Sequence, residues 1–171
     1  GKILKDRIDN LVIILVGTGS IVPELKNQAE QLGITDIVAF EGWQKPSVLN
    51  AYMRNVYLTV IPHRKSVQTD NSSPNKLFIF MLYKKAVLVT NCHSIERIIK
   101  AEECGLVFPS GDSQALADCI LYLYQKPEIG KHMGINGFQS VTDRYNWPNA
   151  SAGLIRLYQQ LLEKSFIGDQ S

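Results

Sequence analysis

Short apolar runs rich in β-branched residues alternate with helical segments along this chain of 171 residues. The run at residues 11–16 is continuously apolar and ends in a glycine-containing turn, which is typical of a strand buried on both faces of a parallel sheet. Further strands are expected at residues 37–40, 57–61, 86–90 and 106–108, with a helical segment between neighbouring strands. This alternation predicts an α/β fold built on a doubly wound parallel sheet.

Prolines, glycines and one aspartate delimit the expected helices. These helices cover residues 23–32, begin at Pro46 and Pro74, cover residues 94–101, and follow Asp112. From Pro127 to about residue 163 the chain is expected to be helical, with a break at residues 145–148. The last helix is expected to pack through Leu154, Leu157, Tyr158, Leu161 and Leu162. Residues 1–165 are therefore predicted to form one domain, and residues 166–171 a frayed tail.

Composition narrows the class of protein. A hydrophobic fraction of 45% and a charged fraction of 20% are ordinary for a globular domain. The formal charge of +2, without a long basic block, argues against a nucleic-acid partner. Cys92, Cys104 and Cys119 are an odd number without metal-type spacing. With no signal peptide evident, this favours a reducing cytoplasm over a disulfide scaffold.

The junction of a polar loop with the helix at Pro74 is suited to binding an anion. Ser73 is expected to cap the helix, and Pro74 suits its first position. The N–H groups of Asn75, Lys76 and Leu77 would then be unpaired, and the helix dipole and the Lys76 ammonium would add positive charge. Such an end binds phosphate. The alternative is an ordinary capped helix with no ligand.

Ligands of doubly wound sheets bind at the carboxyl ends of the strands. Gly17 and Gly19 follow the first strand and would let a phosphate or ribose approach the backbone, although a tight turn explains them equally well. Val22 stands where the dinucleotide fingerprint needs its third glycine, which argues against NAD. His63 is a base, a ligand or a plain loop residue, and Glu96 is a sugar-hydroxyl acceptor or a surface carboxylate.

Taken together, several motifs resemble the C-terminal, nucleotide-sugar-binding half of the retaining GT-B glycosyltransferases, the "glycosyl transferases group 1" family. The resemblance covers most of the chain and implies a Rossmann-like domain. The matching motifs are V-G-x-G at residues 16–19, V-x-F-x-G at 38–42, the strand ending in proline at 52–62, S-P-x-K-x-F at 73–78, G-L-x-F-x-x-G-D at 105–112, and Asn146-Trp147 before the last helix.

The resemblance implies transfer of a sugar, with retention, from a nucleoside diphosphate sugar to a glycan, lipid or polysaccharide precursor, with no metal or other cofactor. Lys76, with Asp70 and Asn71 nearby, would be the catalytic set. The donor would contact Gly17, Gly19, Gly42, Trp43, His63, Ser73, Asn75, Leu77 and Glu96.

Two family carboxylates are absent. The family usually carries two glutamates, and the matching positions here are Asn71 and Ile79. Asp70 could replace the first, one residue out of register, whereas Ile79 cannot hydrogen-bond a ribose. Two alternatives therefore stay open: a non-catalytic nucleotide-sugar-binding or scaffold domain, and another GT-B enzyme such as a nucleotide-sugar epimerase, whose acid/base residues are not evident.

The chain begins with a helix-like segment at residues 1–8. In the family, this helix is preceded by a first strand and by an Arg and a Lys that bind the diphosphate. The resemblance thus implies that this strand and an N-terminal acceptor domain are missing. We expect this chain alone to bind donor weakly, to be inactive, and to self-associate through unpaired strand edges. The longer enzyme is expected in the cytoplasm, in peripheral contact with the membrane.

Overall fold

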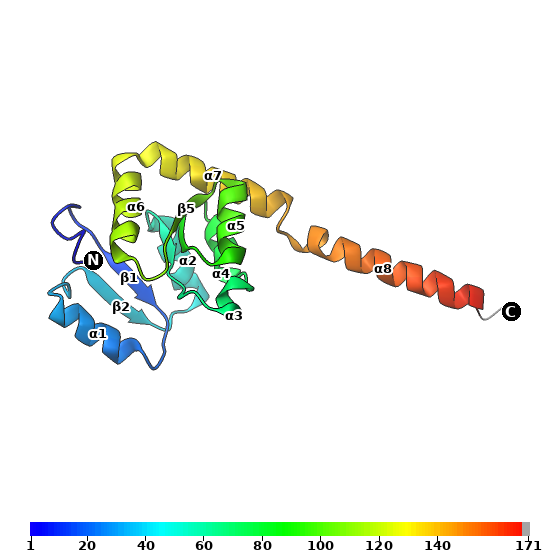
Figure 1. Ribbon diagram of the computed structural model, residues 1–171, viewed down its shortest axis with the longest axis horizontal. Coiled ribbons are helices and arrows are strands. Elements are labelled where there is room, and N and C mark those ends of the chain that lie inside the picture. Colours follow the sequence, from blue (N-terminus) through cyan, green and yellow to red (C-terminus); the bar gives the residue numbers. More distant parts are fainter. Residues whose placement is uncertain (169–171) are drawn as a thin grey trace.

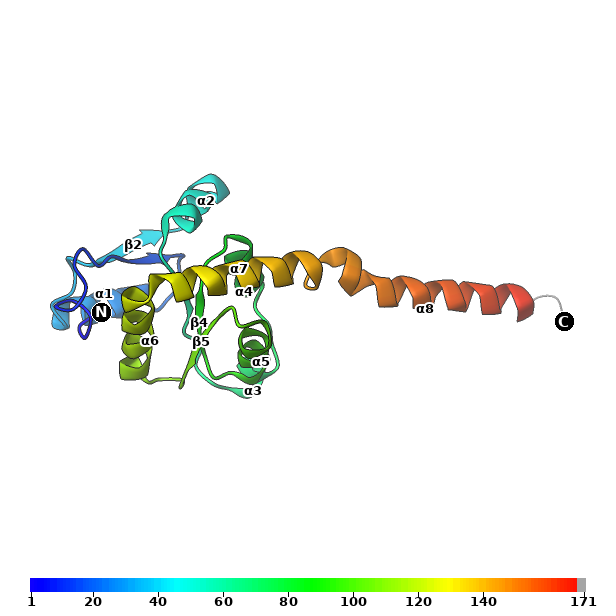
Figure 2. The ribbon, with the colours of Figure 1, turned by 90° about the horizontal axis from the view of Figure 1, so that it is seen from above.

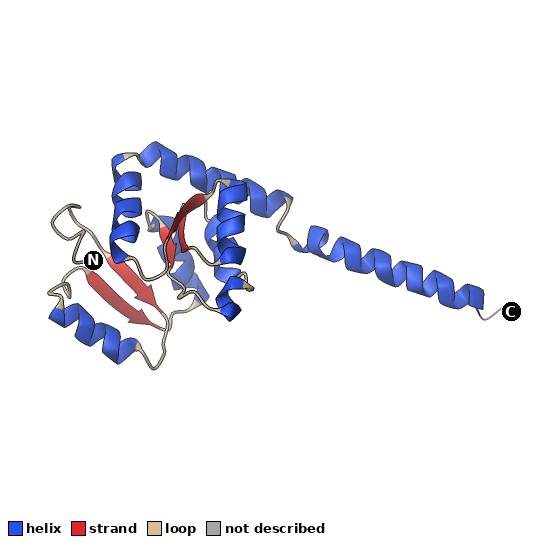
Figure 3. Ribbon diagram, in the orientation of Figure 1, coloured by secondary structure: helices blue, strands red, loops and turns tan. Residues whose placement is uncertain are grey.

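Strands and helices alternate in the computed structural model, which describes the backbone of residues 1–168 and side chains through Leu162 (Figures 1 and 3). The strands are β1 (Ile13–Val16), β2 (Val38–Gly42), β3 (Thr59–Ile61), β4 (Val87–Thr90) and β5 (Gly105–Phe108). The helices are α1 (Val22–Gln31), α2 (Pro46–Asn55), α3 (Val67–Asp70), α4 (Asn75–Leu82), α5 (His93–Glu102), α6 (Ser113–Gln125), α7 (Pro127–Asp143) and α8 (Trp147–Gly168). The predicted order of elements is confirmed, with α3 as an addition inside the expected loop at residues 62–73.

All strand pairs are parallel, which confirms the predicted α/β class. The strands nevertheless form two sheets rather than one. β1 pairs with β2, and β4 lies between β3 and β5 in a three-stranded sheet. Among residues 1–168, no hydrogen bond joins the two sheets. The carboxyl ends of the strands are therefore divided into two groups.

The three-stranded sheet is covered on both faces, as a doubly wound arrangement requires. Val87 and Val89 pack on one side in a cluster with residues of α4 and α5. Leu88, which points to the opposite face, packs with residues of α6 and α7. Burial on both faces explains why β4 consists of apolar, mostly β-branched residues.

The two-stranded sheet is less covered, so the expectation of a first strand buried on both faces is wrong. Leu15 and Val16 are both almost 40% exposed, and Val12, just before β1, is 61% exposed. The reason is that β1 has a strand neighbour on one side only. Leu4 and Ile8, from the N-terminal segment, pack against α6 and cover part of this region.

The N-terminal residues 1–8 form turns rather than a regular helix. Lys5 N–H donates to the Gly1 carbonyl, and Ile8 N–H donates to the Leu4 carbonyl. The Lys5 ammonium contacts the Asp36 carboxylate at 2.7 Å, which holds these turns to the loop before β2.

The last helix departs from the expected packing. The break between α7 and α8 is where the sequence predicts it, but α8 extends away from the body of the protein (Figures 1 and 2). Its expected core residues are half exposed or more: Leu154, Leu157, Tyr158, Leu161 and Leu162. Of the predicted tail, residues 166–168 continue α8, and residues 169–171 lie outside the described part of the chain.

Candidate functional site

The loops that follow β3, β4 and β5 are joined through one residue, Ser110. Ser110 N–H donates to Asn91 Oδ1 at 2.9 Å, and Ser110 Oγ donates to the His63 carbonyl at 3.2 Å. Lys65 N–H in turn donates to Ser110 Oγ at 2.9 Å. No motif in the sequence singles out Ser110, although its place just after the last strand is a signal for a ligand-edge residue. The three loops therefore form one connected edge around His63.

The turn at α3 arises from a local capping box. Thr69 N–H donates to Ser66 Oγ, and Ser66 N–H donates to Thr69 Oγ1 at 2.9 Å. The spacing Ser-x-x-Thr differs from the usual Ser-x-x-Glu signature, which explains why the segment reads as a loop in the sequence. This short helix places Asp70 and Asn71 between β3 and α4.

Both of these polar side chains have structural partners. Asp70 Oδ1 accepts a hydrogen bond from His93 N–H at 2.9 Å and so satisfies a free amide at the start of α5. Ser94 Oγ donates to the Asp70 carbonyl at 2.8 Å. Asn71 Nδ2 donates to the Val67 carbonyl at 2.8 Å. The two predicted catalytic side chains thus hold this loop to α5 and to α3.

The start of α4 is shifted by one residue from the expected position. Pro74, not Ser73, is the N-cap, because its ψ of 138° is extended rather than helical. No side chain caps this helix. Leu77 N–H donates to the Pro74 carbonyl at 2.9 Å, and the Leu77 side chain is fully buried. Leu77 is therefore a core residue, and its amide is not available to an anion.

Two amides at this helix start do fit the prediction. Within the described chain, the N–H groups of Asn75 and Lys76 have no hydrogen-bond partner. Both residues are exposed, and Lys76 adds a cationic side chain to these two free N–H groups. Ile79 lies one turn further along α4 and is 46% exposed, so it does not point into the core.

The ends of β1 and β2 form the second group. Gly17 N–H donates to the Gly42 carbonyl at 2.7 Å, and Trp43 beside it is 70% exposed. Gly17 and Gly42 have φ values of 133° and 62°, which favour glycine. A Cβ built on Gly17, Gly19 or Gly42 meets no atom within 4 Å. These backbones are accessible, as a phosphate- or base-binding turn requires.

His63 and Glu96 differ in their environments. The Nδ1 atom of His63 is buried and has no hydrogen-bond partner among the described residues. Burial, and secondly the Lys76 charge, lower the pKa of His63. Glu96 lies in the first turn of α5, and its carboxylate contacts the Lys100 ammonium at 2.6 Å. A sugar hydroxyl would have to compete with that ion pair for Glu96.

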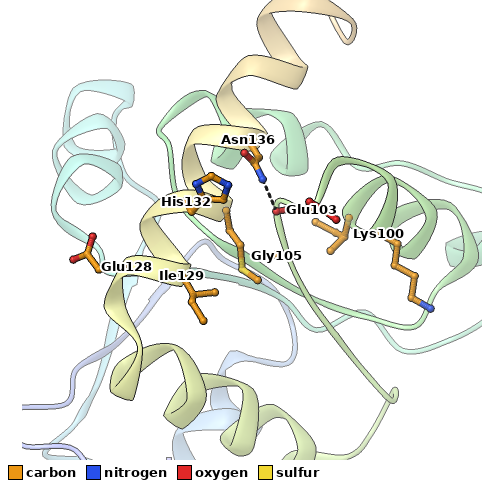
Figure 4. A pocket seen from close by; sticks show the side chains of 9 residues that line it. Lys100, Glu103, Gly105, Glu128, Ile129, His132 and Asn136 are labelled. Atoms are coloured by element: carbon orange, nitrogen blue, oxygen red, sulfur yellow. Dashed lines mark hydrogen bonds between the residues drawn. The ribbon is translucent and has the colours of Figure 1, made fainter.

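A cavity of about 520 Å³ lies away from these loops, between α5, α7 and the start of β5 (Figure 4). Its lining includes the apolar side chains of Ile99, Ile129 and Met133. Asn136 Nδ2 donates to the Glu103 carbonyl at 3.2 Å across it. Because Gly105 begins β5, the cavity is at the amino end of the sheet, opposite the predicted ligand edge.

Two features are absent from the described residues. No group of three or more His, Cys, Asp or Glu side chains is arranged to hold a metal ion there. In the same part of the chain, none of the helices has the length and apolar character needed to cross a membrane.

Comparison with known proteins points in one direction. Residues 2–126 match the family described as "Glycosyl transferases group 1". The phosphatidyl-myo-inositol mannosyltransferase of Mycobacterium leprae is 24% identical over 151 residues, which are 88% of this chain and 38% of that protein. The chain thus spans about two fifths of the length of this relative.

Solved structures share the fold. The C-terminal domain of a glycosyl transferase group 1 family protein (LpcC) from Francisella tularensis has a TM-score of 0.71 at 20% identity, with 85% of this chain and 75% of that chain covered. HepE of Anabaena, in complex with UDP-glucose, has a TM-score of 0.68 at 20% identity, with 94% of this chain and 42% of the HepE chain covered.

Proposed function

Because the chain belongs to the glycosyl transferases group 1 family, we propose that it is the donor-binding half of a longer glycosyltransferase. In this proposal the donor is a nucleoside diphosphate sugar, the acceptor is a glycan, lipid or polysaccharide precursor, and the sugar is transferred with retention. The HepE structure contains UDP-glucose, which supports this class of donor. The rest of the longer protein would bind the acceptor, in the cytoplasm at the membrane surface.

The exposed start of α4 is the observation that carries the proposal. Departure of the nucleoside diphosphate leaves negative charge on its phosphate oxygens, and preorganised N–H groups and cations stabilise such charge. Lys76 and the unpaired N–H groups of Asn75 and Lys76 supply both at one point. Arg64 and Lys65, both exposed in the loop after β3, add further positive charge. This site would use protein cations and amides instead of a metal.

The remaining contacts follow from the accessible backbones at the ends of β1 and β2. We assign the nucleoside base to the turn at Gly42 and Trp43, whose indole is exposed and offers a stacking surface. The pyrophosphate would approach Gly17 and Gly19, which have open space in front of them. The donor would then bridge the two sheets.

A second candidate is a domain that binds the nucleotide sugar without transferring it. The hydrogen bonds of Asp70 and Asn71 favour it, since Asp70 accepts from His93 N–H at the start of α5 and Asn71 donates to the Val67 carbonyl in α3. Ile79 favours it as well, because an exposed apolar side chain stands where the family has a carboxylate. An assay for product with the full-length protein and labelled donors separates transfer from binding alone.

The donor site itself is tested with UDP and GDP, titrated into the chain while backbone amide shifts are recorded. Uridine and guanosine, which lack phosphates, are the matched ligands. We expect the amides of residues 75–78 to respond to the diphosphates and much less to the nucleosides. A response confined to the cavity between α5 and α7 would contradict the proposed site.

A further inference from the structure

His63 lies just after β3 in a loop whose backbone is held by Ser110. The His63 carbonyl accepts a hydrogen bond from Ser110 Oγ at 3.2 Å. Two residues later, Lys65 N–H donates to the same Ser110 Oγ. Ser110 is itself held by Asn91 after β4. The imidazole therefore projects from a position that three strand ends define.

The two ring nitrogens have different surroundings. Nδ1 is buried without a partner. Nε2 is not fully buried, and it makes no hydrogen bond within the described residues. The buried Nδ1 atom has no partner in either tautomer, but a buried N–H group without an acceptor is a rarer case in proteins than a buried acceptor without a donor. A proton on Nε2 is accessible to solvent or to a ligand. The environment therefore favours the neutral ring with its proton on Nε2.

One nearby charge also disfavours protonation of the ring. Burial lowers the pKa of His63, and the positive charge of Lys76, at the start of α4, lowers it further. Both effects disfavour the imidazolium form. Arg64 and Lys65, which follow His63 in the loop, are also cationic. A neutral N–H group can lie among these cations without repulsion and still donate to an anion.

We propose that His63 is held as the neutral Nε2–H tautomer and that this N–H donates to a diphosphate oxygen of the donor beside Lys76. The tautomer follows from the chain's own geometry, whereas the diphosphate contact rests on the proposed function. In this arrangement Lys76 neutralises negative charge on the diphosphate, and His63 orients it through a directional hydrogen bond. An N–H group on a fixed ring has one orientation, whereas a lysine ammonium is a point charge on a flexible chain.

The tautomer is measured on the unliganded chain at neutral pH by long-range ¹H–¹⁵N correlation of the imidazole. We expect the His63 spectrum of a ring protonated on Nε2 and not on Nδ1. A proton on Nδ1, or a doubly protonated ring, would overturn the inference whether or not the chain binds nucleotides.

The contact is measured by titrating UDP into His63→Gln and His63→Asn. The glutamine amide nitrogen can occupy the place of Nε2, whereas the asparagine amide nitrogen reaches only the place of Nδ1. We expect His63→Gln to bind UDP nearly as well as the wild-type chain and His63→Asn to bind about tenfold more weakly. Amide spectra of both variants verify the fold.

The outcomes distinguish the two proposals. If the wild-type chain binds UDP and the two variants bind it equally, the His63 contact is wrong and the donor site stands. If the wild-type chain does not bind UDP, the proposed function fails and the diphosphate contact fails with it. The same inference is overturned if His63→Asn binds better than His63→Gln.

Discussion

At the residue scale, the candidate site depends on a few exposed groups at the start of α4. Lys76 and the N–H groups of Asn75 and Lys76 are available to a ligand. Contrary to the prediction from the sequence, Leu77 offers no free amide and Ser73 does not cap the helix. His63 is close enough for the Lys76 charge to lower its pKa. Fewer of the predicted groups are therefore available to a ligand at this helix start, where Lys76 supplies the positive charge.

Replacing Lys76 with alanine is expected to weaken UDP binding by about 1.5–3 kcal/mol, the range for hydrogen bonds to charged groups. Calorimetric titration of both proteins measures the difference. Lys131→Ala is the matched control, since Lys131 is an exposed lysine on α7 whose partner is Glu128. Equal loss in both variants would indicate a nonspecific effect of net charge and contradict the assignment of Lys76.

Replacing Ile79 with glutamate is expected to tighten binding of the nucleotide sugar, because the side chain is exposed and the family position carries a ribose-binding carboxylate. Leu82→Glu, on the same helix and 47% exposed, adds the same charge one turn further on and should not improve binding. Titrations of the donor into the two variants provide the comparison. Unchanged affinity in Ile79→Glu with an intact fold would show that the ribose does not lie against α4.

At the element scale, α3 and α5 stabilise each other's ends. The Asp70 carboxylate accepts from the first amide of α5, and the Ser94 hydroxyl returns a hydrogen bond to the Asp70 carbonyl. A carboxylate at a helix N-terminus also interacts favourably with the helix dipole. This pairing connects the loop before α4 to a helix whose apolar face is in the core.

Replacing Asp70 with alanine is expected to reduce the free energy of unfolding by about 0.5–2 kcal/mol, as for other N-terminal helix caps. Asp70→Asn keeps an oxygen acceptor and should lose less. Urea unfolding followed by circular dichroism measures the free energy of unfolding of both variants. Asp112→Ala removes the corresponding hydrogen bond from Ala115 N–H at the start of α6, and its loss of stability is the reference for comparison. Full stability of Asp70→Ala would mean that its structural bonds contribute little, leaving a direct role in the site as the better explanation.

At the scale of the whole molecule, two apolar surfaces are exposed. The projecting helix α8 presents Leu154, Ile155, Leu157 and Tyr158, each more than 50% exposed. β1 is paired on one side only, and Val12 beside it is 61% exposed. Large exposed apolar surfaces and free strand edges favour association.

We expect the chain to associate with itself as its concentration increases, and sedimentation equilibrium tests this. Replacing Leu154 and Leu157 with glutamine should shift the equilibrium toward the monomer, because both side chains lie on the apolar face of α8. Replacing the polar Gln159 and Gln160 with alanine is the control. A wild-type chain that sediments as a monomer at every concentration would refute this expectation.

Apart from the turns at residues 1–8 and the short helix α3, the type and order of the elements are determined by the sequence alone, as are the starts of α2 at Pro46, of α7 at Pro127 and of α6 after Asp112. The reason is that the periodicity of a strand or helix and the backbone limits of proline act within a few residues. The candidate edge follows from the same order, because ligands of parallel sheets bind at strand ends.

Only the tertiary structure decided that the strands divide into two sheets, that α8 leaves its leucines exposed, and that Asp70 holds α5. These features depend on contacts between distant parts of the chain. Asp70 and His93 are 23 residues apart, and nothing in the local pattern around Asp70 distinguishes a free carboxylate from a helix cap. The two nitrogens of His63 are a case of the same kind, because their burial depends on three loops that are joined only in the folded chain.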